Sequence, residues 1–361
     1  MNIPQPAHAA RLGRPRLLIV GCGDTGMHVL ERLAGRKRVF ALTSSPGRLP
    51  ELRAAGAVPL LGNLDCPRQL ARLRGLAADI LVLAPPPGQG EGDPRSRRLA
   101  AVLRRPASKA RARPAAMGPG PRQIRHAAIV AKPRSGALAR ATRPITVVYA
   151  STTGVYGDAR GRRLSETAPV RPASPRGRRR VAAEAAWRSP GPARARQAHL
   201  GLASWRAIVL RIPGIYGRDR LPLERLRTGL PRLAPGEDVY TNHIEIGDLA
   251  RALEAALYRG RPQRIVHAAD GQDLKMGDYF DAVADAAGLP RPPSLPAAQV
   301  RAAVSPAMWS FMQESRRLDN RRLVDELRVR LRHPTVRHAL DEWFAAGRPT
   351  PTRCVPPGTG K

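Results

Sequence analysis

Short runs of apolar residues alternate with segments of helical periodicity over the first hundred residues. Apolar runs of this length, bounded by glycine, proline or polar residues, are typical of strands buried on both faces of a sheet. The pattern predicts strands at 16–20, 39–43, 57–61 and 79–84. The segments between and after them predict helices at 25–34, 49–55, 66–73 and 94–104.

The pattern resumes after a long interruption, with strands predicted at 145–150 and 207–212 and a helix at 180–187. Strands alternating with helices predict an α/β fold, specifically a Rossmann-type doubly wound parallel sheet. Beyond Tyr216 shorter elements, proline-rich turns and a closing helix at 336–344 predict a smaller C-terminal α/β lobe. The expected organisation is a disordered tail (1–15), a sheet domain (16–215), the smaller lobe (216–345) and a flexible tail (346–361).

Charge changes this picture in two places. The chain has 62 Lys and Arg against 28 Asp and Glu, a formal net charge of +34. The excess is concentrated in basic insertions near 105–143 and 171–200, where acidic residues are nearly absent. Proline, alanine and glycine fill the first of them, a composition that cannot bury a core. We interpret both as solvated arginine-rich loops rather than a nucleic-acid site, because aromatic residues that would stack on bases are missing there.

Cysteines and apolar segments give no sign of a metal centre or a membrane. The three cysteines, Cys22, Cys66 and Cys354, are scattered without CxxC spacing, so neither a zinc site nor a disulfide framework is indicated. The apolar run at 17–20 is too short for a signal sequence or a spanning helix. We therefore expect a cytoplasmic protein with no metal and no membrane partner.

The most informative local motif is Gly21-Cys22-Gly23-Asp24-Thr25-Gly26, a GxGxxG between a predicted strand and a predicted helix. In this setting the first glycine permits a tight turn, the second lets the backbone approach a pyrophosphate, and the third allows the helix to pack closely on the strand. The amides of Asp24 and Thr25 would face the anion at the helix N-terminus. The motif predicts a bound dinucleotide, so 16–215 is expected to be an NAD(P)-binding domain.

The end of the second strand favours NADP over NAD. A carboxylate at this point binds a ribose 2′-hydroxyl and repels a 2′-phosphate. This chain has Thr43 and Ser44 there, followed by the cation of Arg48. These groups suit a 2′-phosphate, although an ordinary Ser-Pro-Gly turn explains them almost as well. Asn63 is expected beside the adenine, and Asp65 either borders the adenine or caps the next helix.

Three later segments carry a resemblance to a known family. The segment 151–158 (STTGVYGD) resembles the SSxxVYG segment of the extended short-chain dehydrogenases/reductases, the NAD-dependent epimerase/dehydratase family. The segments 211–217 (RIPGIYG) and 242–250 (NHIEIGDLA) are similar to that family's sixth-strand and NRIHVxDLA segments. The segment 316–323 (RRLDNRRL) resembles a stretch of a bacterial nucleoside-diphosphate-sugar epimerase subgroup. The resemblance covers about 16–340 without the basic insertions.

The resemblance implies an oxidoreductase or epimerase, with a nucleotide-sugar-like substrate bound by the lobe 216–345. In that family a Ser or Thr binds the reacting oxygen, and a Tyr and Lys in YxxxK exchange the proton while hydride moves to or from the nicotinamide. Thr152 matches the first position, but Arg176 and Arg180 occupy the Tyr and Lys positions. A guanidinium stays protonated and has no acceptor, so neither can be the general base. Arg180 could still supply the cation near the ribose.

Tyr156 is the alternative proton donor, although a structural ring packed under its loop is the favoured interpretation. The resemblance also places Pro85, Pro213 and Tyr216 beside the cofactor or substrate, and it implies a homodimer formed through two helices. Further substrate candidates are Arg218, Asn242 and His243.

Several candidates have simpler structural explanations. On a predicted strand, His243 and Glu245 share one face, where an exposed pair is favoured over substrate contact. Asp248 is expected to cap a helix rather than bind metal. The sequence leaves two functions open: an NADP-dependent enzyme, or a cofactor-binding sensor or scaffold that lacks turnover because the Tyr and Lys are absent.

Overall fold

The computed structural model describes residues 13–104, 144–189 and 205–345. The expectations for most of the N-terminal tail, for the basic segment 105–143, for 190–200 and for the C-terminal tail concern residues outside these ranges. Within them, no helix is both long and apolar enough to cross a membrane.

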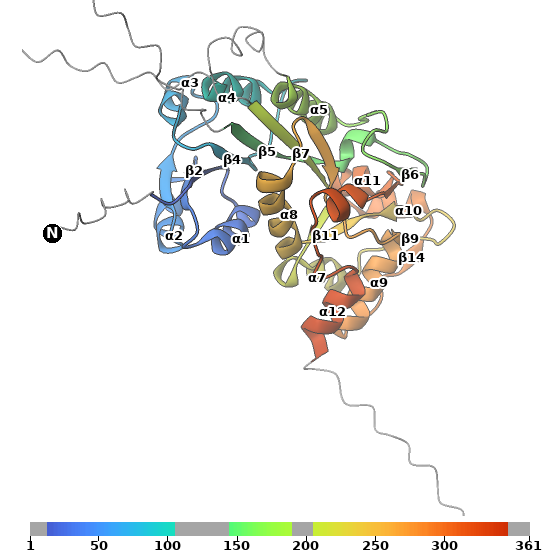
Figure 1. Cartoon of the computed structure of the whole chain (residues 1–361). Coiled ribbons are helices and arrows are strands. Elements are labelled where there is room, and N and C mark those ends of the chain that lie inside the picture. Colours follow the sequence, from blue (N-terminus) through green and yellow to red (C-terminus); the bar gives the residue numbers. More distant parts are fainter. Residues whose placement is uncertain (1–12, 105–143, 190–204, 346–361) are drawn as a thin grey trace, which may run out of the picture.

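A seven-stranded sheet, parallel at every pairing, forms the centre of the fold, in the order β12-β7-β5-β4-β1-β2-β3 (Figure 1). Its strands are β1 (Arg16–Val20), β2 (Arg38–Thr43), β3 (Val58–Leu61), β4 (Asp79–Val82), β5 (Ile145–Thr152), β7 (Trp205–Ile212) and β12 (Arg264–His267). The chain starts at β1 and winds outward in both directions, as expected when crossovers keep one hand. The predicted α/β doubly wound fold is confirmed.

Helices cover both faces of the sheet, and each face has its own apolar core. On one face lie α1 (Asp24–Leu33), α2 (Leu49–Ala54) and α8 (Ile246–Arg259); on the other lie α3 (Pro67–Leu70), α4 (Pro94–Arg104) and α5 (Pro175–Arg188). Both cores consist mainly of Leu, Val, Ile and Ala, as the low aromatic content requires. The strands show no polar alternation because both of their faces are buried.

The sheet extends beyond the first 215 residues. Its last strand, β12, and the covering helix α8 come from the segment expected to form the substrate lobe. The basic segment near 171–200 also differs from a loop insertion in its described part. Helix α5 begins at Pro175, capped by Ser174, and packs on the sheet through the fully buried Trp187.

The remaining elements form a smaller lobe beside the carboxyl ends of the strands (Figure 1). Its own apolar cluster joins Tyr216, Phe280 and Leu340 with their neighbours. Its elements are β8 (Gly214–Tyr216), α7 (Leu223–Arg227), β9 (Arg232–Leu233), β10 (Tyr240–Thr241), β11 (His243–Glu245), β13 (Leu274–Lys275), α9 (Met276–Ala287), β14 (Ser294–Leu295), α10 (Ala297–Ala303), α11 (Pro306–Met312), β15 (Arg317–Leu318) and α12 (Val336–Phe344). The pair β6 (Arg163–Leu164) and β15 connects this lobe to the loop after β5.

Candidate functional site

Three adjoining pockets lie at the carboxyl ends of the central strands, which is where open α/β sheets bind ligands. The first pocket encloses about 370 Å³ beside β1, β2 and β3. A central pocket of about 280 Å³ shares Gly21, Gly23 and Leu83 with it. An outer pocket of about 380 Å³ shares Thr152 and Arg176 with the central one and extends into the smaller lobe. Together they form one cleft.

The three glycines of the turn after β1 meet three different geometric demands. Gly21 has a φ of +83°, and a Cβ there would lie 2.6 Å from the backbone nitrogen of Ala84. A Cβ on Gly26 would lie 2.9 Å from the Cys22 sulfur, so the third glycine brings α1 close to the turn. A Cβ on Gly23 would meet nothing within 4 Å. Gly23 therefore leaves open space where a ligand can approach the backbone.

Helix α1 begins directly after Gly23 and presents its N-terminal amides to the central pocket. Gly23, Asp24 and Thr25 all line that pocket. The Asp24 carboxylate is engaged by Arg220, whose Nη1 lies 2.6 Å from Asp24 Oδ2. Arg220 lines both the central and the outer pocket, so this ion pair joins the glycine turn to the smaller lobe across the cleft. The unpaired amides of the first turn favour an anion here.

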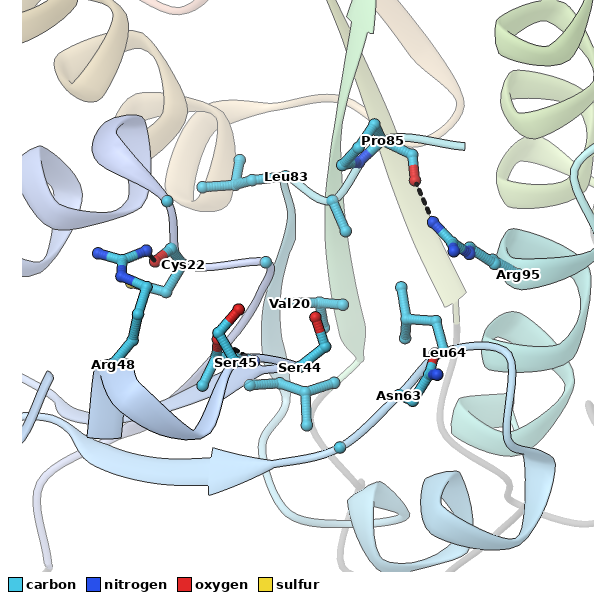
Figure 2. Close-up of a pocket in the computed structure, with 16 residues that line it drawn as sticks. Val20, Cys22, Ser44, Ser45, Arg48, Asn63, Leu64, Leu83, Pro85 and Arg95 are labelled. Carbon is cyan, nitrogen blue, oxygen red and sulfur yellow. Dashed lines mark hydrogen bonds between the residues drawn. The ribbon is translucent and has the colours of Figure 1, made fainter. Parts of the chain in front are cut away.

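The first pocket carries hydroxyls and cations and no carboxylate among its lining residues. Figure 2 shows Ser44, Ser45 and Arg48 on one side of it and Asn63 and Leu64 on the other. Arg48 donates from Nη1 to the Cys22 carbonyl oxygen at 2.5 Å and pairs with Glu51, which raises the pKa of the guanidinium further.

Thr43 and Pro85 also line the first pocket. The Thr43 hydroxyl accepts a hydrogen bond from the Ser45 amide and thereby shapes the turn.

Arg95 closes the opposite end of the first pocket. Its guanidinium pairs with both carboxylate oxygens of Asp65 at 2.8 and 2.5 Å, and this contact lowers the Asp65 pKa. Of the two alternatives for Asp65, the helix cap is wrong, because Cys66 is the N-cap residue of α3 and no side chain caps that helix. No motif indicates Arg95, which lies on α4, 30 positions after Asp65.

Thr152 and two arginines of α5, Arg176 and Arg180, lie together in the central pocket. Thr152 Oγ1 accepts a 3.3 Å hydrogen bond from the Gly154 amide, and Pro213 lies on the same wall. Arg180 is buried and donates to the Tyr149 hydroxyl and the Ala150 carbonyl oxygen. Desolvation, together with the charge of Arg180, lowers the pKa of Arg176. Two neighbouring guanidiniums make this wall of the cleft attractive to anions.

Four of the predicted site residues do not line the cleft pockets. Tyr156 is 3% exposed; its hydroxyl is 2.5 Å from His267 Nε2 and accepts from Arg211 Nη1 at 2.7 Å. His267 Nδ1 donates to the Asp319 carbonyl oxygen, so Nε2 accepts a hydrogen bond from the Tyr156 hydroxyl. Burial raises the Tyr156 pKa. This placement favours the structural interpretation of Tyr156 over the acid–base one.

The other three are Tyr216, Arg218 and His243. Tyr216 is 1% exposed, with its hydroxyl turned to the Thr335 carbonyl oxygen, and Arg218 points to solvent outside the pockets. His243 stacks on Tyr279 with ring centroids 4.2 Å apart, and burial lowers its pKa to about 3. The expected exposure of His243 and Glu245 is wrong: both are buried, because β11 pairs with β8 under α12.

Asp248 also has a different role from the predicted cap. Glu245 is the N-terminal cap of α8 and accepts from the Asp248 amide at 2.9 Å. Asp248 is fully buried and accepts from the backbone amides of Arg332 and His333, each at 2.8 Å.

The outer pocket contains groups that the sequence did not single out. Asn242 lines it as expected and holds the Arg316 carbonyl oxygen through Nδ2 at 2.9 Å. Tyr240, Glu314 and Arg316 also line this pocket, with Glu314 paired to Arg316 at 2.8 Å. Tyr240 and Glu314 can exchange protons, which Arg176 and Arg180 cannot. They come from segments 74 positions apart, so no local motif reveals them.

Comparison with known proteins extends the resemblance to the fold. No protein-family model matches the sequence, and no curated protein matches it. Among solved structures, a functionally unknown conserved protein from Silicibacter pomeroyi is 28% identical, with a TM-score of 0.68 over 92% of this chain and 99% of its own. A human epimerase family protein with NADPH is 18% identical, with a TM-score of 0.62 over 92% and 100% of the two chains.

A third similar structure is UDP-glucuronic acid 4-epimerase from Bacillus cereus, in complex with UDP-glucuronic acid and NAD. It is 14% identical, with a TM-score of 0.59 over 91% of this chain and 98% of its own. The chain thus has the fold of the NAD-dependent epimerase/dehydratase family over its full sheet and smaller lobe, and the resemblance is confirmed at that level.

Proposed function

We propose that this protein binds NADP in the cleft and catalyses an oxidoreduction or epimerisation of an anionic, nucleotide-sugar-like substrate. The observation that carries the proposal is the continuity of the cleft. A glycine turn open at Gly23 and a carboxylate-free pocket with Arg48 lie at one end, and an arginine-lined pocket lies at the other. NADPH in the similar human structure and UDP-glucuronic acid in the Bacillus cereus structure support the two ligand classes.

Each part of the cleft has a proposed task. The diphosphate of the cofactor lies over Gly21, Gly23 and Gly26 and accepts from the first amides of α1. Ser44 and Arg48 bind the 2′-phosphate, with Asn63 beside the adenine. Thr152 hydrogen-bonds the reacting oxygen, and the outer pocket, which the smaller lobe lines on one side, holds the substrate. When bound, the nicotinamide accepts or donates the hydride.

Proton transfer requires a group other than Arg176 and Arg180. Tyr240 is the phenol of the outer pocket, which also contains Thr152. A phenol both donates and accepts a hydrogen bond, so Tyr240 can exchange a proton with a substrate hydroxyl. We therefore assign the acid–base role to Tyr240 in place of Tyr156.

Cofactor choice is tested by calorimetric titration of the full chain with NADPH and NADH. We expect NADPH to bind more tightly, and Arg48→Gln to weaken NADPH by roughly 10- to 100-fold through loss of a charge-assisted bond, with little effect on NADH. Arg53→Gln, on the helix α2 that directly follows Arg48 but outside the pocket, is the control and should leave both affinities unchanged. Equal or tighter NADH binding would contradict the NADP assignment.

The second candidate is a cofactor-binding sensor or scaffold without turnover, favoured by the absence of the Tyr and Lys of YxxxK. An assay for conversion of UDP- and dTDP-sugars by NADPH-saturated protein distinguishes the enzyme from the sensor or scaffold. For an enzyme, Tyr240→Phe should lower turnover by on the order of 100-fold or more at unchanged NADPH affinity. Stoichiometric NADPH binding without conversion of any of these sugars would support the sensor or scaffold.

A further inference from the structure

A buried cluster outside the cleft has the composition of a metal site. It consists of Glu245 at the start of α8, Asp248 in the first turn of that helix, and His333 from the segment before α12. All three side chains are buried, and each offers one ligand atom, with these atoms all within 4.8 Å of one another. Buried ionised groups at this density require a compensating partner.

The hydrogen bonds of His333 define which ring nitrogen is protonated. Nε2 lies 3.2 Å from Glu342 Oε2, and because a carboxylate only accepts, Nε2 carries the proton. The other nitrogen, Nδ1, is buried and has no hydrogen-bond partner. It faces Glu245 Oε2 at 3.5 Å. Two acceptors therefore point at each other in the interior of the protein.

The distance between these two atoms fits a shared metal ion better than a hydrogen bond. A good N–H···O hydrogen bond spans about 2.7–3.2 Å, so 3.5 Å is long for an imidazolium that donates to Glu245. A nitrogen and an oxygen bound to the same Zn²⁺ at about 2.0–2.1 Å, with tetrahedral or wider angles, are roughly 3.3–3.5 Å apart.

The surroundings hold all three ligands in place. Glu342 orients His333 from behind, as a carboxylate commonly does for a ligating histidine. Asp248 is held by the two backbone amides of 332–333 and by Arg251, which donates to Oδ1. Its Oδ2 accepts one hydrogen bond and retains a lone pair. Glu245 is fixed by capping α8.

We propose that Glu245, Asp248 and His333 bind a divalent transition-metal ion, with Zn²⁺ the best match to one imidazole and two carboxylates. The ion would bind α8, which covers the sheet, to the C-terminal segment that packs on the smaller lobe. Its expected role is structural, since none of the three ligands lines the cleft pockets. The proposal does not depend on the function assigned to the cleft.

The test uses the full chain without an affinity tag, stripped with a chelator and titrated with ZnCl₂ and CoCl₂. We expect about one metal ion per chain, a visible absorption band for Co²⁺, and a melting temperature that rises with Zn²⁺. His333→Gln should weaken Zn²⁺ binding by at least 10- to 100-fold. The exposed neighbour His338, 5.8 Å from His333 between ring centroids, provides the matched control His338→Gln, which should bind like the wild type.

Glu245→Gln is a second variant in case His333→Gln does not fold. Its amide oxygen can still cap α8, but the ligand charge is lost, so Zn²⁺ binding should again weaken. The circular dichroism spectrum of each variant reports whether it is folded. Zn²⁺ that neither binds nor raises the melting temperature would overturn the proposal. Zn²⁺ binding that is equal in the wild type and both ligand variants would overturn it as well.

Discussion

Single residues decide what chemistry the cleft allows. Arg176 and Arg180 occupy the positions where the resembling family has Tyr and Lys, and both lie at the central pocket. They keep positive charge on the wall beside Thr152 but remove the general base. The loss of the Tyr and Lys is visible in the sequence. The proposed acid–base residue, Tyr240, is not, because it reaches the outer pocket from a strand of the smaller lobe.

One buried carboxyl group, that of Asp270, should make the stability of the protein depend on pH. Asp270 is 6% exposed, its Oδ2 has no hydrogen-bond partner, and desolvation raises its pKa to about 8. Between about pH 4 and 8 the folded protein retains a proton that the unfolded chain releases. This group therefore lowers stability as pH rises through that window.

Asp270→Asn should remove this loss. We expect the free energy of unfolding of the variant, relative to wild type, to increase by on the order of 2–4 kcal/mol from pH 5 to 8 in urea titrations. Asp285, whose pKa the neighbouring Arg291 lowers, is the control: Asp285→Asn should show no such trend over the same range. A pH-independent difference for Asp270→Asn would refute the buried, protonated carboxyl.

At the scale of elements, the sequence predicts most of the sheet correctly. Strand β1, helix α4 and helix α12 have the predicted bounds, because apolar runs and helical periodicity are local signals. Helix α5 begins five residues earlier than predicted, since its first turn is rich in arginine and shows no apolar periodicity. Pairing between distant segments, such as β6 with β15, has no local signal.

A buried network of polar and charged side chains attaches α5 to the sheet. Glu184 on α5 binds Arg211 of β7 through both oxygens at 3.1 and 2.7 Å and accepts from Ser151 of β5 at 2.6 Å, with all three side chains buried. Glu184→Gln leaves the buried guanidinium without its counter-charge. The variant should lose about 3–5 kcal/mol of unfolding free energy.

The control variant removes an exposed ion pair that Arg178, on the same helix, makes with Glu91. Glu91 pairs with Arg178 and is 73% exposed at its side chain, so Glu91→Gln should cost at most about 1 kcal/mol. Chemical denaturation of both variants measures the difference. If Glu184→Gln lost as little unfolding free energy as Glu91→Gln, the buried network would not anchor α5.

At the scale of the whole molecule, the cleft is the product of chain topology. Its wall residues come from β1, the end of β2, the loop after β4, α5 and the smaller lobe, which meet at the carboxyl ends of parallel strands. Sequence motifs indicate the cleft residues that lie at strand ends, such as Gly23 and Thr152. They do not indicate Arg95 and Arg220, which reach the cleft from helices and loops that carry no motif.

Calorimetric titration of NADPH into the wild type and Gly23→Ala tests the central claim most directly. A methyl group on Gly23 meets nothing in the protein, so the variant should keep its melting temperature, yet it occupies the space assigned to the diphosphate. We predict that NADPH binds the wild type and the control Gly47→Ala alike, and Gly23→Ala at least 10-fold more weakly. Unchanged binding to Gly23→Ala, or no binding of either dinucleotide to the wild type, would contradict the account.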